Sequence, residues 1–151
     1  MDSIVNKIKN TKKLPNEIEE GNIEYKRKII PESINRFEGL STQLTWRLNE
    51  GNRLYNKKEA FYIIGINDNG TYGSIEIKTI TKSLDNLSKI AKMSSAKIDK
   101  TKIYFTKNGT VAVVKIVNII TIKNKNEYNV IFLGNSGVGK SSIIGSLCYG
   151  I

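Results

Sequence analysis

The sequence predicts an α/β fold, a two-layer α/β sandwich in which helices cover a sheet. Three observations support this prediction. Between residues 21 and 122 the hydrophobic patterns follow the order strand, helix, strand, helix, strand, strand. Each of these elements has one apolar face, and an Asn-Gly turn joins the last two strands. Elements with one apolar face bury it by packing in layers.

The first strand and the first helix are distinguished by the spacing of their apolar residues. Apolar and polar residues alternate from residue 23 to 30, which predicts a strand that Pro31 ends. From residue 33 to 49 apolar residues recur every three or four positions, which predicts a helix closed by Gly51. Trp46 falls on the polar side of this helix and is a candidate partner contact, unless a neighbouring loop covers it.

The second half of the domain contains the remaining strands and helix. Residues 60–66 form a continuous apolar run, which is typical of a central strand buried on both faces. A turn at residues 68–70 follows, across which residues 71–75 can pair back. Strands are predicted over residues 98–105 and 111–122. A second helix is predicted between this turn and residue 98, because apolar residues recur there at spacings of three and four. These residues are Ile80, Leu84, Leu87 and Ala91.

These patterns divide the chain into four parts. Residues 1–20 are polar and are expected to form a basic arm, and residues 21–122 form the α/β domain. A polar linker is expected at residues 123–127. Residues 128–151 begin with an apolar strand that is expected to start another domain.

Composition limits the possible chemistry of the 151 residues. One cysteine and no histidine exclude an internal disulfide, a zinc site built from Cys and His, and catalysis by histidine. No apolar run approaches the ~20 residues that cross a bilayer, so a cytoplasmic protein is expected. The net charge of +10 favours binding to phosphates, above all those of RNA. Equally, the lysines are spread out and follow a composition rich in Lys, Asn and Ile.

A phosphate-binding P-loop follows the apolar strand at residues 128–133. The segment matches G-x-x-x-x-G-K-[ST] and precedes a helical start at residues 143–147. Its glycines let backbone N–H groups surround a phosphate, Lys140 reaches the β- and γ-phosphates, and Ser141 is expected to bind Mg²⁺. The predicted nucleotide-binding residues are Gly134, Asn135, Ser136, Gly137, Val138, Gly139, Lys140, Ser141 and Ser142.

The chain contains little sequence after this motif. Eleven residues follow Lys140, whereas a P-loop domain needs further strands for its switch residues and second Mg²⁺ ligand. The sequence therefore predicts a truncated P-loop GTPase domain, with its first strand, P-loop and half-helix, that cannot hydrolyse nucleotide alone. Because a P-loop contacts phosphates, the motif leaves guanine and adenine undistinguished.

A resemblance to a known family rests on the P-loop and on residues 14–26, 36–38, 42–51 and 64–70. Through these segments the chain resembles the eukaryotic GTP-binding protein 1 and 2 family of translational GTPases, which are akin to elongation factor 1-alpha. The resemblance implies that the intact protein binds GTP and Mg²⁺ and acts on ribosomes, tRNA or RNA turnover. One departure is the Ser136-Gly137 pair, where family members usually have Val-Asp, and another is Ser142 in place of Thr.

A fainter resemblance links the N-terminal domain to the AlbA-like domain of Schlafen proteins, through residues 20–26 and 65–70. It implies nucleic-acid binding and, in some members, RNA cleavage by acidic residues. If the first two strands are neighbours, Glu24 and Asp68 approach each other. Glu19 or Glu20 could add a third oxygen ligand for Mg²⁺ or Mn²⁺.

A simpler interpretation is also open for these residues. Glu24 and Lys26 could form a solvated strand face, while Asp68 supports the turn. Our leading hypothesis is the N-terminal fragment of a GTP-binding protein. The alternatives are a stand-alone RNA- or ribosome-binding module that has lost its GTPase domain and, less favoured, an AlbA-like ribonuclease.

Overall fold

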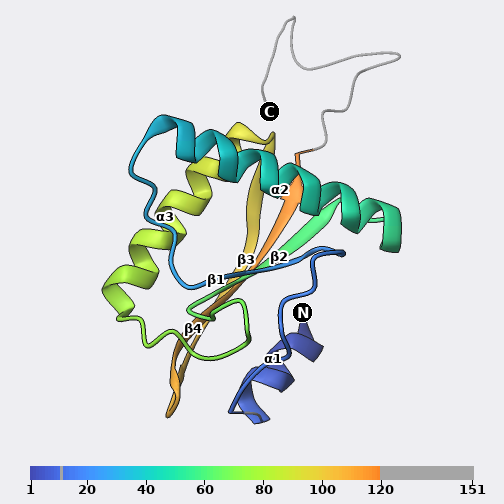
Figure 1. Ribbon diagram of the computed structural model, residues 1–151. Helices are drawn as coiled ribbons and strands as arrows, with labels where there is room; N and C mark the ends of the chain where they lie inside the picture. The colour runs from blue at the N-terminus through green and yellow to red at the C-terminus, as the bar shows by residue number, and fades with distance from the viewer. Residues whose placement is uncertain (11, 120–151) are drawn as a thin grey trace, which may run out of the picture. The chain divides into compact units, whose positions relative to one another are not determined.

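The structure is a computed structural model that describes residues 1–10 and 12–119 and has a mixed α/β fold (Figure 1). Four strands form one sheet in the order β1-β2-β4-β3. The predicted α/β sandwich is confirmed, with one additional helix at the N-terminus. The elements are α1 (Asp2–Asn10), β1 (Ile23–Lys26), α2 (Ile34–Tyr55), β2 (Glu59–Ile64), α3 (Ile77–Met93), β3 (Ala96–Thr106) and β4 (Gly109–Asn118).

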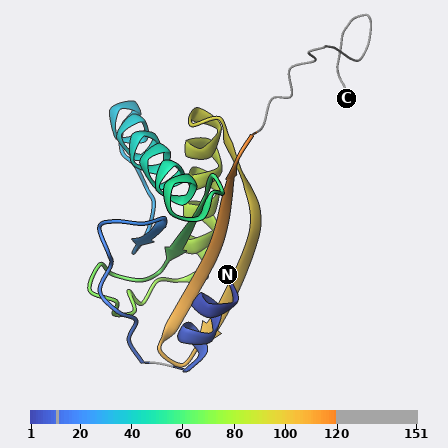
Figure 2. The ribbon, with the colours of Figure 1, turned by 90° about the vertical axis from the view of Figure 1, so that its right-hand side faces the viewer.

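The sheet is built from one parallel and two antiparallel pairings. Strand β1 lies parallel to β2, and α2 provides the crossover between them. Strand β2 then pairs antiparallel with β4, and β4 with β3. The β3–β4 hairpin turns at the predicted Asn-Gly position. Figure 2 shows α2 and α3 together on one side of this sheet.

Helix α2 is longer than the sequence predicted. The hydroxyl oxygen of Ser33 caps its first turn by accepting from the Arg36 N–H at 3.3 Å. The predicted end at Gly51 is wrong, because the helix continues to Tyr55 and ends at a left-handed Asn56 with φ 58°. A Cβ at Gly51 would lie 2.1 Å from the Glu59 carbonyl oxygen. Gly51 therefore permits a close approach of the backbone that leads into β2.

The main hydrophobic core lies between the sheet and helices α2 and α3. On the helices its fully buried residues include Leu44, Leu48, Ile80 and Leu87, which the predicted apolar stripes contained. On the sheet it contains alternate residues of β4, namely Ala112, Val114 and Ile116.

A second, smaller core lies on the opposite face of the sheet, under α1. Ile4 and Ile8 of this helix pack with Val111 and Val113 of β4, and the Tyr72 hydroxyl donates to the Ile8 carbonyl at 3.1 Å. The N-terminal segment, predicted as a polar arm, thus contributes a helix packed on the sheet. A nine-residue helix offers few apolar positions from which to recognise a period, so the sequence pattern does not reveal it.

The chain between α1 and β1 is held by backbone hydrogen bonds to the turn after β2. The N–H of Leu14 donates to the Gly70 carbonyl at 2.9 Å, and the N–H of Glu17 donates to the Asp68 carbonyl at 2.7 Å. Across this turn, the predicted pairing of residues 71–75 is confirmed in part, as an antiparallel bridge between Ile66 and Tyr72. Among the described residues, no helix is both long and apolar enough to cross a bilayer.

Candidate functional site

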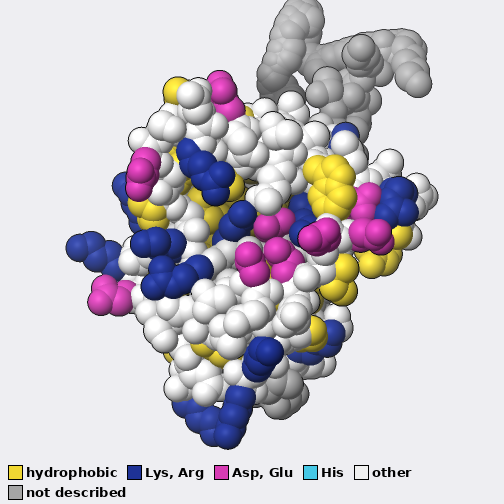
Figure 3. All heavy atoms as spheres, in the orientation of Figure 1, with side chains coloured by type: hydrophobic (Ala, Val, Ile, Leu, Met, Phe, Trp, Pro, Cys, Tyr) yellow, Lys and Arg dark blue, Asp and Glu magenta, His cyan; other side chains and the backbone are white. Residues whose placement is uncertain are grey.

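The predicted P-loop lies outside the described residues. This applies to every residue from 134 to 142, including Lys140 and Ser141, so their predicted roles in binding phosphate and Mg²⁺ stay predictions. The described part of the chain contains the other candidate site, the acidic residues around β1. Figure 3 shows Asp and Glu side chains gathered near the middle of one face of the molecule.

The three acidic residues proposed as metal ligands are placed differently from one another. Glu24 is buried on β1 at 3% exposure, whereas Glu20 and Asp68 are exposed. Within residues 1–10 and 12–119, no group of three acidic, Cys or His side chains could hold a metal ion. The structure therefore does not bring these carboxylates together as a metal site.

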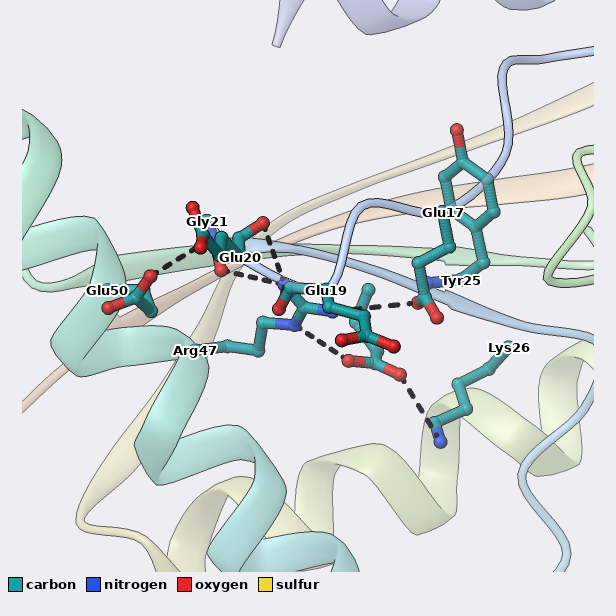
Figure 4. A network of polar contacts seen from close by, with 9 residues as sticks. Glu17, Glu19, Glu20, Gly21, Tyr25, Lys26, Arg47 and Glu50 are labelled. Atoms are coloured by element: carbon teal, nitrogen blue, oxygen red, sulfur yellow. Dashed lines mark hydrogen bonds and ion pairs between the residues drawn. The ribbon is translucent and has the colours of Figure 1, made fainter.

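Glu24 instead binds a buried arginine that sequence reasoning missed. Arg47, on the inner side of α2, is 4% exposed, and its Nε donates to Glu24 Oε1 at 2.8 Å (Figure 4). Its Nη1 points at the carbonyl oxygens of Glu19, Glu20 and Gly21, at 3.1, 3.3 and 2.8 Å. One guanidinium thus joins α2, β1 and the segment before β1.

Lys26 provides a second cation for the same carboxylate. Its Nζ lies 3.4 Å from Glu24 Oε2, while Arg47 occupies the other oxygen. The interpretation of Glu24 and Lys26 as a solvated strand face is wrong for Glu24, which is buried and paired. A carboxylate held by two cations on both oxygens is poorly suited to ligate a metal as well.

Glu17 completes this charged cluster. Its Oε2 accepts a hydrogen bond from the Tyr25 N–H at 2.6 Å and lies 3.8 Å from Arg47 Nη2. Burial raises the pKa of the Glu17 carboxyl above its ordinary value, the Tyr25 N–H opposes this, and the nearby Glu24 carboxylate raises it further. Burial also raises the pKa of the Tyr25 phenol. The cluster is thus a densely connected structural network in which two carboxylates share Arg47.

Glu50 forms a separate contact one turn further along α2. Its Oε1 accepts from the Gly21 N–H at 3.0 Å and from Arg53 Nη2 at 2.8 Å. The hydrogen bond from Arg53 lowers the pKa of the Glu50 carboxyl to about 2, with a further contribution from the Gly21 N–H. Glu50 and Arg47 together fix the residues that lead into β1.

Arg47 could have been found from the spacing of α2. It lies three residues after Leu44 and one before Leu48, so it falls within the apolar stripe of the helix. A charged residue in such a stripe requires a buried partner, which the stripe alone does not identify. Neighbouring Trp46 is 45% exposed, and the Arg47 guanidinium lies 5.1 Å from its ring centroid. The predicted position of Trp46 on the polar side is consistent with this exposure.

Two open cavities flank the loop after β1. One, of about 390 Å³, is lined by Lys26, Lys28 and Arg36 together with Glu32. The other, of about 890 Å³, is lined by residues of that loop and of α3, with both signs of charge present. Because acidic and basic side chains are mixed in both, neither cavity indicates one class of ligand.

Comparison with known proteins identifies curated relatives of this chain. It is 35% identical over 149 residues to GTP-binding protein 2 of mouse and equally to that of human. The match covers 95% of this chain but 24% of each relative, so the chain spans about a quarter of their length. No family model and no solved structure matches it. Over most of its length, this chain is thus related to proteins named for binding GTP.

Proposed function

We propose that this chain is part of a GTP-binding protein and that residues 134–142 bind the phosphates of GTP. The observation that carries the proposal is a complete G-x-x-x-x-G-K-[ST] motif in a chain related to GTP-binding protein 2. In this proposal Lys140 contacts the β- and γ-phosphates, while the Ser141 hydroxyl binds the Mg²⁺ that accompanies the nucleotide.

The extent of the match supports including the motif in the relationship. The match leaves about a twentieth of the 151 residues uncovered. That number of residues is smaller than nine, the number that follow Ser142. The segment from Gly134 to Ser142 is thus within the span compared. The similarity also supports guanine as the base, a choice that the motif alone leaves open.

The finer proposal is that the protein acts in translation, on ribosomes, tRNA or RNA turnover. Its support is the resemblance to translational GTPases and the net charge of +10, which favours association with RNA. A ribonuclease is not favoured, because Glu24, its expected metal ligand, is held by Arg47 and Lys26.

Ligand-detected NMR of the 151-residue chain with GTP and Mg²⁺ tests the nucleotide site. This method detects binding as weak as about 1 mM, equivalent to about −4 kcal/mol. We expect a GTP signal that both GDP and ATP reduce by competing for the site, because the P-loop contacts phosphates and not the base. Lys140→Ala should weaken binding at least tenfold, because it removes a charge that contacts two phosphates.

Lys107→Ala is the matched control, since Lys107 is an exposed lysine at the tip of the β3–β4 hairpin. It should leave the GTP signal unchanged. No signal from the unmodified chain, or an equal signal from Lys140→Ala, would contradict the assignment of this site.

A further inference from the structure

Strand β3 contains a β-bulge that changes which side chains face outward. Ile98 pairs with Ile116, and the next pair is Lys100 with Lys115, so Asp99 is an additional residue in the strand. In a regular strand Lys100 and Lys102 would lie on the same face as Ile98, towards the helices. The extra residue reverses the alternation and places them on the opposite face.

The register identifies the face that carries these lysines. Paired residues of neighbouring strands project to the same side, and Lys102 pairs with Val113, a member of the core under α1. Lys97, before the bulge, pairs with Val117, which lies on that same side by alternation along β4. Three lysines, Lys97, Lys100 and Lys102, thus form a row along the outer face of β3.

The acidic side chains next to this row are already paired. Lys115 Nζ lies 3.5 Å from a Glu59 carboxylate oxygen and 3.8 Å from one of Asp99. In the described part of the chain, no carboxylate forms an ion pair with any of the three lysines of the row. All three are exposed, so among residues 1–10 and 12–119 the row is a line of positive charge without an ion-paired carboxylate.

Edge protection alone does not explain this arrangement. Strand β3 is at the edge of the sheet, where lysines discourage pairing with other chains. That role does not require the charges to share one face. The other face of β3 ends in Ile103 and Phe105, which are 37% and 72% exposed. Charge is therefore segregated to one face, as contact with a linear polyanion requires.

We propose that the outer face of β3 binds the phosphate backbone of an extended, single-stranded nucleic acid through Lys97, Lys100 and Lys102. Residues two apart in a strand are separated by about 6.7 Å, which is the spacing of Lys100 and Lys102. Lys97 and Lys100 flank the bulge and pair with Val117 and Lys115, which are also two apart. Successive lysines can therefore meet successive phosphates of one strand. Lysine contacts phosphate as a point charge and distinguishes no base, so binding depends little on sequence. The site is independent of GTP binding by residues 134–142.

Fluorescence anisotropy of the full chain with labelled single-stranded RNA, without nucleotide, tests this interface. The triple variant Lys97→Glu/Lys100→Glu/Lys102→Glu should bind at least tenfold more weakly. Its matched control, Lys78→Glu/Lys82→Glu/Lys92→Glu, makes the same charge change on α3, the helix on the other side of the sheet. This control should lose less than about threefold, because a remote charge acts only through the screened field.

The salt dependence measures how many contacts the row makes. Three single-strand phosphate contacts contribute a slope of about −2 to log K against log salt. The β3 variant should lose this slope, and the α3 control should keep it. Single-stranded DNA of equal length should bind within about threefold of RNA, since the lysines contact phosphate and not ribose.

Several results would overturn the proposal. These are equal losses in the two triple variants, unchanged binding by the β3 variant, or a preference above tenfold for either nucleic acid. Circular dichroism and thermal unfolding of both variants establish that they are folded. Lys140→Ala should retain full RNA binding, so a failure of the GTP site and a failure of this interface are distinguishable.

Discussion

Helices α2 and α3 cover the same face of the sheet but hold the adjoining irregular chain in different ways. Helix α3 uses neutral side chains, which bind one residue of the loop after β1, Ile29. Ser83 Oγ accepts from the Ile29 N–H, and Asn86 Nδ2 donates to the Ile29 carbonyl, both at 2.9 Å. Helix α2 uses charges, with Arg47 on three carbonyls and Glu50 on one N–H of residues 19–21.

This difference determines how much stability is lost when a contact of each helix is removed. A neutral hydrogen bond in the folded protein replaces a hydrogen bond to water in the unfolded chain. Removing one of its two partners leaves the other polar group buried and unsatisfied. A buried arginine requires a carboxylate, and its removal leaves that carboxylate buried with less compensation. We therefore expect α2 to be the more sensitive of the two helices to substitution of its buried polar residues.

The largest effect is expected from Arg47→Ala. The change leaves Glu24 with Lys26 alone and removes the donor from three carbonyls, so the free energy of unfolding should fall by about 3–5 kcal/mol. Urea denaturation measures this loss. Arg53→Ala, whose side chain is 57% exposed, should cost less than about 1 kcal/mol. Similar losses in the two variants would refute the importance assigned to the buried pair.

Two glycines of α2 provide the next test. Alanine normally favours a helix over glycine by about 1 kcal/mol, and Gly39→Ala, which meets nothing within 4 Å, should show this gain. Gly51→Ala should instead destabilise by about 2–3 kcal/mol, because its Cβ would overlap the Glu59 carbonyl. Thermal unfolding of the two variants should thus shift in opposite directions. A gain at Gly51 would show that α2 can move away from β2.

A smaller effect is expected from the neutral contacts of α3. Ser83→Ala removes the acceptor of the buried Ile29 N–H and should cost about 1–2 kcal/mol in urea denaturation. Ser88→Ala, a partly exposed serine of the same helix, is the control and should stay within about 0.5 kcal/mol. A loss at Ser83 as large as that of Arg47→Ala would remove the distinction drawn between the helices.

The mildest expected effect is a change in pH dependence at Glu50. Its pKa is about 2 in the folded protein against an ordinary 4.5. Because the folded value is lower, its stabilising contribution is complete above pH 4.5 and is lost as pH falls towards 2. Glu50→Gln should therefore lose less stability than the unmodified protein over that interval. The control is Glu38→Gln, an exposed residue of α2, which should follow the unmodified protein.

The order of strands and helices between residues 21 and 119 was predictable, because each apolar pattern is long enough to define its period. Helix α1 was not, since Ile4, Val5 and Ile8 are few and a polar stretch follows them. The end of α2 was misplaced because glycine usually stops a helix. At Gly51 the missing side chain accommodates the backbone near Glu59, a contact made only when the chain folds.

The candidate acidic site was predictable only in part. The burial of Glu24 depends on α2 crossing over β1, which no local pattern reveals. Asp68 is expected near Glu24 if β1 and β2 are neighbours, and the two strands do pair. However, the Asp68 side chain is exposed and lies on the turn beyond β2. The bulge at Asp99 was also hidden, since a strand with one extra residue resembles two short, unrelated alternations.

The docking of α1 onto β4 has a consequence for the timing of folding during synthesis. At ~5–20 residues per second, Val113 is made roughly 5–20 s after Ile8, its partner in the smaller core. A helix of nine residues is marginal in water by itself. We therefore expect the apolar side chains of α1 to stay in water until β4 has been synthesised. Helix α1 precedes the sheet in the sequence, but its stability is expected to depend on β4, the strand of the sheet that is synthesised latest.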